Sequence, residues 1–185
     1  MKKIIALALS LVMLFTVAAA AATETAEKSE LGKLNIKGKF TIKTGELPEG
    51  YTIDKTIEDD LGITTLIDAP EKAAIILSIT FDETFADVER FNDVDEETLN
   101  WLKSTWTDEF DQVEFEDTET EYGTKLLVVR VHFDDGTMMG YVFTVYKGYM
   151  LELSIIPDGK DLVTEENIQA VVKFLSDMDF EPIEE

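Results

Sequence analysis

Apolar and polar residues alternate most regularly between Gly123 and Pro157, and this pattern predicts three antiparallel strands. Two-residue turns at Asp135-Gly136 and Lys147-Gly148 would join them, because glycine supplies the positive φ that tight hairpins need. The predicted strands are Lys125–Asp134, Thr137–Tyr146 and Tyr149–Ile156. We expect this meander to form the centre of an antiparallel sheet.

The two turns also predict which residues lie opposite one another. The first turn places Val131 opposite Gly140, and the second places Val142 opposite Leu153. Together they put these residues on one core face: Leu127, Val129, Val131, Phe133, Met138, Val142, Leu151, Leu153 and Ile155. The other face is mixed and comprises Val128, Arg130, His132, Met139, Tyr141, Phe143, Val145, Glu152 and Ser154. We expect a helix or a loop to cover part of this mixed face.

Segments before the meander predict further strands. Ala73–Phe81 is rich in β-branched residues and almost continuously apolar, which is typical of a central strand covered on both faces. We expect it to pair with Ile63–Ile67 through a turn at Pro70. The other predicted strands are an edge strand with alternating Leu34, Ile36, Phe40 and Ile42, the segments Tyr51–Ile57 and Gly62–Asp68, and an acidic strand around Val113 and Phe115.

Two amphipathic helices are predicted on either side of the meander. Asp95 is the expected N-cap of the first helix, and Thr164 is the expected N-cap of the second, which runs through Met178. The apolar stripe of the first helix consists of Leu99, Leu102, Trp106 and Phe110. A short helical turn is expected at Phe85–Phe91, and the acidic tail after Phe180 is expected to fray. The predicted fold class is therefore α+β, an antiparallel sheet packed by two main helices as an α-β-α sandwich.

The first 22 residues have the features of a signal peptide. Lys2 and Lys3 precede an apolar run, Ile4–Val17, and alanines follow it. Cleavage near Ala20–Ala22 would release an exported protein with no stable membrane insertion. Retention as an N-terminal anchor is the alternative, since the apolar run is almost long enough to cross a bilayer.

The rest of the chain is interpreted as a flexible lead-in, residues 23–33, and a single globular domain, residues 34–185. The chain of 185 residues has 39 acidic and 16 basic side chains, which gives a formal net charge of −23. Such a field repels nucleic acid and anionic membranes, whereas weak binding of divalent cations is compatible with it. The chain has no cysteine, which excludes disulfides, thiolate metal ligands and a lipid-modified cysteine.

Two short motifs resemble the PsbP-like family of exported proteins. Phe40-Thr41-Ile42 leading to Pro48-Glu49-Gly50-Tyr51 is similar to the family's opening strand and Pro-x-Gly-aromatic turn, and Asp68-Ala69-Pro70 before the apolar strand also fits. Tyr51 stands where the family often has tryptophan. The resemblance implies an α-β-α sandwich used for binding and assembly, mostly without known catalysis. It assigns no active-site residue to this chain.

Catalytic or metal-binding patterns are weak in this sequence. His132 is the only histidine, so a zinc site built from several histidines is excluded. The run Asp108–Glu121 holds eight acids and no base, which favours a solvated acidic face over a calcium loop, because EF-hand spacing is missing. Paired carboxylates could serve a hydrolase, but so many acids make such pairs uninformative. We therefore expect neither enzymatic activity nor a cofactor.

The mixed face of the meander is the predicted place for a partner. Arg130 interrupts an apolar strand and is expected to face Tyr141, which in turn would face Ser154. Trp101 lies off the main stripe of its helix and is a further candidate contact. The leading hypothesis is an exported, non-catalytic binding or assembly module for a protein or small-molecule partner. The alternatives are a structural or stress-related cell-envelope protein without a discrete ligand site and a hydrolase that uses paired carboxylates.

Overall fold

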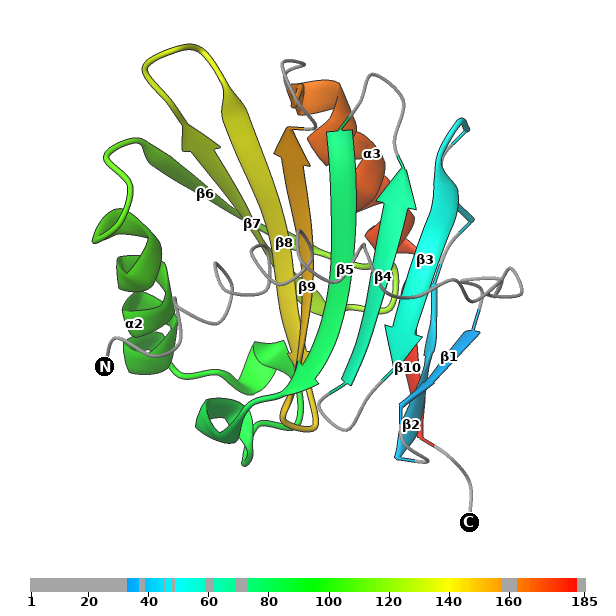
Figure 1. Ribbon diagram of the computed structural model, residues 1–185. Coiled ribbons are helices and arrows are strands. Elements are labelled where there is room, and N and C mark those ends of the chain that lie inside the picture. Colours follow the sequence, from blue (N-terminus) through cyan, green and yellow to red (C-terminus); the bar gives the residue numbers. More distant parts are fainter. Residues whose placement is uncertain are drawn as a thin grey trace.

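The computed structural model describes residues 33–36, 39–44, 46–47, 49–58, 62–68, 73–157 and 163–182. The predicted signal peptide, the lead-in up to residue 32, the turn at Pro70 and the last three residues of the tail lie outside these residues. The described chain is an α+β structure with a large antiparallel sheet, a small second sheet and two α-helices (Figure 1). The predicted fold class is confirmed.

The large sheet has seven strands in the order β3-β4-β5-β9-β8-β7-β6, and the small sheet has the order β1-β2-β10. The strands are β1 (Lys33–Ile36), β2 (Phe40–Lys43), β3 (Thr52–Glu58), β4 (Gly62–Asp68), β5 (Ala73–Phe81), β6 (Val113–Glu119), β7 (Lys125–His132), β8 (Met138–Tyr146), β9 (Tyr149–Pro157) and β10 (Asp179–Pro182). The helices are α2 (Glu96–Thr107) and α3 (Glu165–Ser176), with 3-10 turns η2 (Glu83–Phe85) and η3 (Phe91–Asp93). These two separate turns replace the single helical turn predicted at Phe85–Phe91.

Strand β5 connects the N-terminal strands to the meander. It pairs with β4 on one side and with β9 on the other. Ile63 lies opposite Ile79 and Ile67 opposite Ile75, which confirms the predicted pairing of this apolar segment. The continuous apolar sequence of β5 is explained by its place near the middle of the sheet.

Both helices begin where the sequence predicts. The Asp95 carboxylate accepts a hydrogen bond from the backbone N–H of Thr98 at 2.8 Å. The Thr164 hydroxyl accepts one from the backbone N–H of Asn167 at 3.3 Å. Such caps satisfy donors that have no partner within the first helical turn. The predicted apolar stripe packs against the sheet, with Leu99, Leu102 and Trp106 on α2 and Phe110 just beyond the end of the helix at Thr107.

The small sheet corrects two predictions about the chain ends. The single N-terminal edge strand is a hairpin of β1 and β2, in which Leu34 lies opposite Ile42. Glu181 and Pro182, the first residues of the tail predicted to fray, belong to β10, in which Phe180 lies opposite Ile42. Phe180 stacks on Tyr146 with ring centroids 4.5 Å apart. Burial of this aromatic ring explains why Asp179–Pro182 pairs with β2 as a strand.

The second hairpin of the meander has the predicted register. Tyr146 lies opposite Tyr149 and Val142 opposite Leu153. Lys147 has a φ of 50° and Gly148 a φ of 77°, the pair of positive values that a type I′ turn requires.

The first hairpin differs from the prediction by one residue. Its loop has three residues, because the backbone N–H of Phe133 donates to the carbonyl of Thr137 at 2.9 Å. Only the third loop residue, Gly136, has a positive φ, at 84°. This is the geometry of a three-residue loop that ends in a left-handed residue. In consequence Val128 lies opposite Val142, although the predicted register places Val129 there.

That single residue turns β7 over relative to the prediction, because side chains alternate between the faces of a strand. Leu127, Val129 and Val131 pack on the α2 side, whereas Leu126 and Val128 belong to the core on the α3 side. The predicted core face is therefore right for Val142, Leu151, Leu153 and Ile155 of β8 and β9 and wrong for β7.

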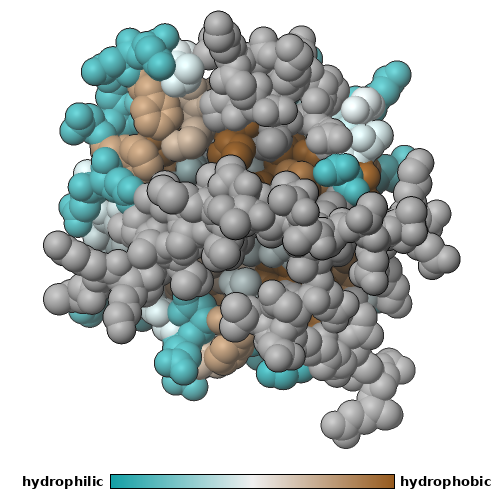
Figure 2. Space-filling view, viewed as in Figure 1, coloured by the Kyte–Doolittle hydropathy of each residue, from teal (hydrophilic) through white to brown (hydrophobic). Residues whose placement is uncertain are grey.

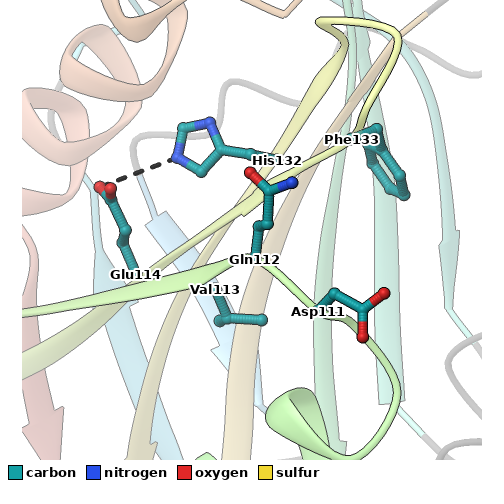
Figure 3. A pocket seen from close by; sticks show the side chains of 6 residues that line it. All are labelled: Asp111, Gln112, Val113, Glu114, His132 and Phe133. Carbon is teal, nitrogen blue, oxygen red and sulfur yellow. Dashed lines mark ion pairs between the residues drawn. The ribbon is translucent and has the colours of Figure 1, made fainter.

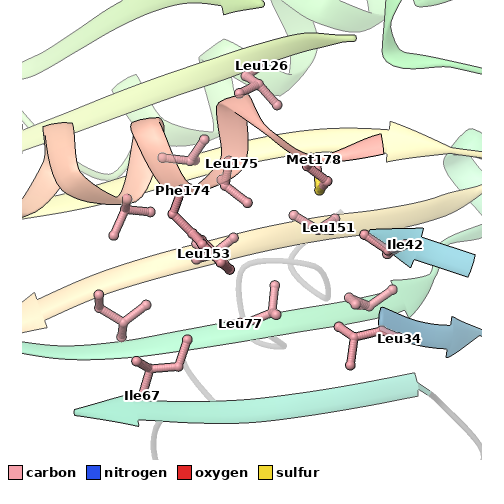
Figure 4. Close-up of a cluster of buried hydrophobic side chains, with 14 of the residues drawn as sticks. Leu34, Ile42, Ile67, Leu77, Leu126, Leu151, Leu153, Phe174, Leu175 and Met178 are labelled. Carbon is pink, nitrogen blue, oxygen red and sulfur yellow. The ribbon is translucent and has the colours of Figure 1, made fainter. Parts of the chain in front are cut away.

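The faces of the large sheet are covered unequally. On one face, α3 and the small sheet close a continuous core in which Leu153, Ile155 and Ile168 are fully buried (Figure 4). On the other face, α2 has no fully buried residue, and its apolar side chains are half-buried. The sheet residues beneath α2 are nevertheless buried, since Leu127, Val129 and Val145 have no exposed surface, so the two sides differ in how deeply their helices are buried.

Candidate functional site

Arg130 lies on the sealed side of the sheet and holds two glutamates. Its Nε donates to Oε2 of Glu165 at 2.9 Å, and its Nη2 donates to Oε1 of the same residue at 2.8 Å. The same Nη2 lies 2.8 Å from Oε2 of Glu116. Arg130 therefore ties the first turn of α3 to β7 and to the edge strand β6.

The charges of this cluster stabilise each other. The hydrogen bond from Arg130 lowers the pKa of Glu165, and the same bond raises the pKa of Arg130 further above its ordinary value. Glu165 thus contributes stability above its ordinary pKa, and that stability is lost as the pH falls through the lowered pKa. These contacts explain Arg130 as a structural tether.

Arg130→Met is expected to lower the free energy of unfolding by about 1 to 3 kcal/mol, because charge-assisted hydrogen bonds are lost. The loss should stay within this range because water screens the two carboxylates that the variant leaves unpaired. The side chains of Glu116 and Glu165 are 50% and 54% exposed. Urea unfolding measures the change. Lys103→Met is the control, because Lys103 makes a single ion pair of 3.5 Å with Asp117. Equal losses in the two variants would contradict the tether.

The three predicted partner residues are not brought together. Arg130 lies opposite Gly140 and not opposite Tyr141, so Arg130 and Tyr141 point to different faces of the sheet. This correction follows from the longer loop of the first hairpin. The predicted pairing of Tyr141 with Ser154 is confirmed. Trp101 lies on α2 with 39% of its surface exposed.

A shallow polar hollow lies where β6 begins and β7 ends, and Figure 3 shows its lining. The residues around it are Asp111, Gln112, Val113, Glu114, His132 and Phe133. Nε2 of His132 lies 3.7 Å from Oε2 of Glu114, and the Gln112 amide donates to Asp134 at 3.1 Å. Across the described residues, no group of three or more histidine and carboxylate side chains is placed to hold a metal ion.

The predicted acidic run lies partly on β6, the edge strand of the large sheet. Val113 and Phe115 are half-buried, and Glu114, Glu116 and Glu119 between and after them are exposed. Charged side chains on an edge strand discourage pairing with another chain. This part of the run therefore has a structural explanation.

The partly covered side of the sheet carries the second candidate, which we call the α2-side face. It consists of Leu66 on β4, Ile76 and Ser78 on β5, and Met150, Glu152 and Ser154 on β9. Leu66 is half-buried and belongs to neither apolar cluster, whereas Ile76 and Ser154 are buried, with 9% and 8% of their surface exposed. In Figure 1, α3 lies behind the sheet and α2 stands beside β6, away from β4 and β5. At the left of Figure 2, on the side where α2 and β6 lie, apolar residues are bordered by hydrophilic ones.

Glu152 is the charged residue at the centre of this face. Its carboxylate accepts a hydrogen bond from the Ser154 hydroxyl at 2.7 Å, and Ser78 lies opposite it on β5. Burial raises the pKa of Glu152, and the bond from Ser154 lowers it by less. Among the described residues, no lysine, arginine or histidine pairs with this carboxylate. A half-buried anion without a cation is costly in an apolar surrounding.

An aromatic wall stands next to Glu152. Tyr141 lies diagonally across from it on β8, and the Trp106 ring of α2 packs on Tyr141 with centroids 4.3 Å apart. Burial raises the pKa of Tyr141, and the charges of Glu152 and Glu109 raise it further. The arrangement offers a carboxylate beside aromatic rings, which is a setting that suits a cation.

Glu152→Gln is expected to change how stability depends on pH. A raised pKa means that the folded state binds the proton more tightly, so Glu152 lowers stability as the pH rises from its ordinary pKa to the raised one. The stability gained by Glu152→Gln should therefore grow over this range, as measured by urea unfolding in a series of buffers. Glu119→Gln, at an exposed position, is the control for removing one negative charge. A gain that is the same at every pH, or the same in both variants, would contradict this interpretation.

The sequence contained a signal for Glu152 that the prediction did not use. On a central strand, one acid at a position that alternates with core residues is unusual, because charged groups are seldom buried without a partner. Leu151 and Leu153, on either side, are both buried. The prediction placed Glu152 and Ser154 of β9 on the correct face. Which residues surround Glu152 depends on the neighbouring strands β5 and β8.

Comparisons with known proteins give no family for this chain. No family model matches it, and no curated protein matches it. In the described part of the chain, no helix combines the length and the apolar character needed to cross a membrane.

Proposed function

We propose that this protein is an exported, non-catalytic module that binds a partner through the α2-side face of its large sheet. The observation that carries the proposal is the unequal coverage of the sheet. One side holds a closed core, whereas α2 buries no residue completely, Trp101 on α2 is 39% exposed, and Leu66 on β4 is half-buried outside both clusters. Partly exposed apolar side chains of this kind are typical of an interaction site. The resemblance to PsbP-like proteins also favours a binding role.

A neutral apolar dye, Nile red, tests this proposal on the chain as exported. We expect saturable binding with brighter, blue-shifted emission, because the dye enters an apolar surface. Leu66→Glu should weaken the binding several-fold. Tyr122→Ser is the control, since Tyr122 is 56% exposed but lies beside the end of α3. Failure of the dye to bind, or equal loss in both variants, would favour a structural protein without a ligand site.

Export is tested separately by sequencing the N-terminus of the protein from the producing cell. The positive start, the apolar run and the alanines predict a mature N-terminus between Ala19 and Glu24. Recovery of the chain with Met1 intact would contradict cleavage and favour the anchored alternative.

A further inference from the structure

The outer edge of β6 presents a row of backbone groups that β7 does not bind. Strand β6 ends the large sheet, so β7 is its one neighbour (Figure 1). The carbonyl of Gln112 accepts a hydrogen bond from the N–H of His132 at 2.9 Å, and the N–H of Thr120 donates to the carbonyl of Thr124 at 2.9 Å. Alternate residues of an antiparallel strand face its neighbour, and the residues between them face away. The outward backbone groups therefore belong to Val113, Phe115, Asp117 and Glu119.

This edge is open in the part of the chain that the structure describes. No described residue makes a hydrogen bond to the four outward N–H and C=O pairs. The side chains of Glu114 and Asp117 are 70% and 65% exposed, so solvent reaches the edge. Helix α2 packs on the face of β6, where Nζ of Lys103 lies 5.6 Å from the centroid of the Phe115 ring. An exposed edge of this kind is a template for an extended peptide.

The side chains of β6 select the peptide. Glu114 and Glu116 point to the side of the sheet that carries α3. Val113 and Phe115 are half-buried on the other side. The acids repel a second copy of this chain, which has a formal net charge of −23, but they attract lysine and arginine. The hollow at the start of β6 is lined by Asp111 and Glu114, so a cationic side chain there would meet two carboxylates.

We propose that β6 accepts an extended basic peptide as an additional strand of the large sheet. The peptide runs antiparallel to β6, as β7 does, and places lysine or arginine beside Glu114 and Glu116. β-branched side chains alternate with these cations and lie beside Val113 and Phe115. The edge is separate from the α2-side face, so this inference goes beyond the proposed function.

Four synthetic peptides test the inference on the exported chain by NMR titration of its backbone amide signals. The first alternates lysine and threonine, and the second has glutamine in place of every lysine. The other two are lysine peptides with N-methyl groups, on the threonines in one and on the lysines in the other. Antiparallel pairing directs the threonine N–H groups to β6 and the lysine N–H groups away from it. Methylated threonines should therefore block the added strand, and methylated lysines should not.

With the lysine peptide, amide hydrogen exchange should slow at least about tenfold at the four outward positions and change little at Glu116, whose N–H faces β7. Methylated threonines should weaken binding more than about tenfold, methylated lysines less than about threefold, and glutamine in place of lysine at least about fivefold. Asp117→Pro removes one outward N–H without removing a bond to β7 and should weaken binding about tenfold. Asp117→Asn is the matched control, because it removes the charge and keeps the N–H.

Equal weakening by the two methylated peptides, or equal slowing of exchange at Glu116 and at the outward positions, would overturn strand addition. Equal binding of the lysine and glutamine peptides would overturn the basic partner. No slowing with any peptide would overturn both, whereas Nile red binding to the α2-side face does not depend on β6. The methylated peptides give this test on the unchanged protein even if urea unfolding shows that Asp117→Pro does not fold. Self-association that slows exchange at the same positions would assign the edge to a second copy and overturn the basic partner.

Discussion

Val142→Asp is expected to abolish cooperative folding. Val142 is completely buried on β8, opposite Val128 and Leu153, in the core under α3. A carboxylate at this position would lose its hydration with no cation to replace it. We expect a loss of more than about 4 kcal/mol, which is a large part of the stability of a domain held by about 5 to 15 kcal/mol.

Circular dichroism during urea unfolding measures this effect, and His132→Ala is the control. The His132 side chain is 37% exposed and lies 3.7 Å from Glu114, so its removal should change the urea midpoint little. Similar midpoints for the two variants would refute the assignment of Val142 to the core.

Gly140→Val is expected to destabilise the protein by about 3 kcal/mol, because there is no room for a side chain between β8 and α3. A Cβ atom at Gly140 would lie 2.7 Å from Cγ1 and 2.9 Å from Cδ1 of Ile168. The hydrogen bonds of Arg130 to Glu165 hold the same helix against the sheet, so α3 cannot simply move away.

A double-mutant cycle with Ile168→Ala tests the cause. Ile168→Ala alone creates a cavity and should cost about 2 to 5 kcal/mol. The double variant should be more stable than the sum of both losses by at least about 1 kcal/mol, because each change makes room for the other. Additive losses in urea unfolding would show that Gly140 matters for a reason other than contact with Ile168.

Most of the secondary structure was predictable because local chemistry determines it. Contacts with residues nearby in the sequence determine several of these elements. They are the helix caps at Asp95 and Thr164, the apolar strand Ala73–Phe81 and the turn at Lys147-Gly148. Contacts between distant segments were not predictable in the same way. Strand β10 depends on Phe180 packing against Tyr146, and no pattern within the acidic tail indicates that contact.

The face of β7 shows why a regular pattern can still mislead. Leu126 through Val129 are all buried, so apolar residues occupy both faces of the strand and its sequence fits either register equally well. The three-residue loop between β7 and β8 determined which register forms. Asp135 accepts hydrogen bonds from the N–H and the hydroxyl of Thr137, and only Gly136 takes a left-handed conformation there.

This register decided which candidate residues meet. Arg130 was expected beside Tyr141 but instead faces α3, where two glutamates bind it. Tyr141 remained on the side predicted for it and lies beside Trp106 and near Glu152. The candidate surface therefore moved from Arg130 to the α2-side face, where Tyr141 lies opposite Ser154 and beside Trp106.

The most direct test of the binding face uses isoleucine methyl groups as reporters in an NMR titration with Nile red. Ile75 and Ile76 are neighbours on β5 but point to opposite sides of the sheet, since Ile75 lies opposite Ile155 and Ile76 opposite Ser154. Binding on the α2-side face should shift the Cδ1 methyl signal of Ile76 and leave that of Ile75 unchanged. Equal shifts at both methyl groups, or a shift at Ile75 alone, would contradict the account.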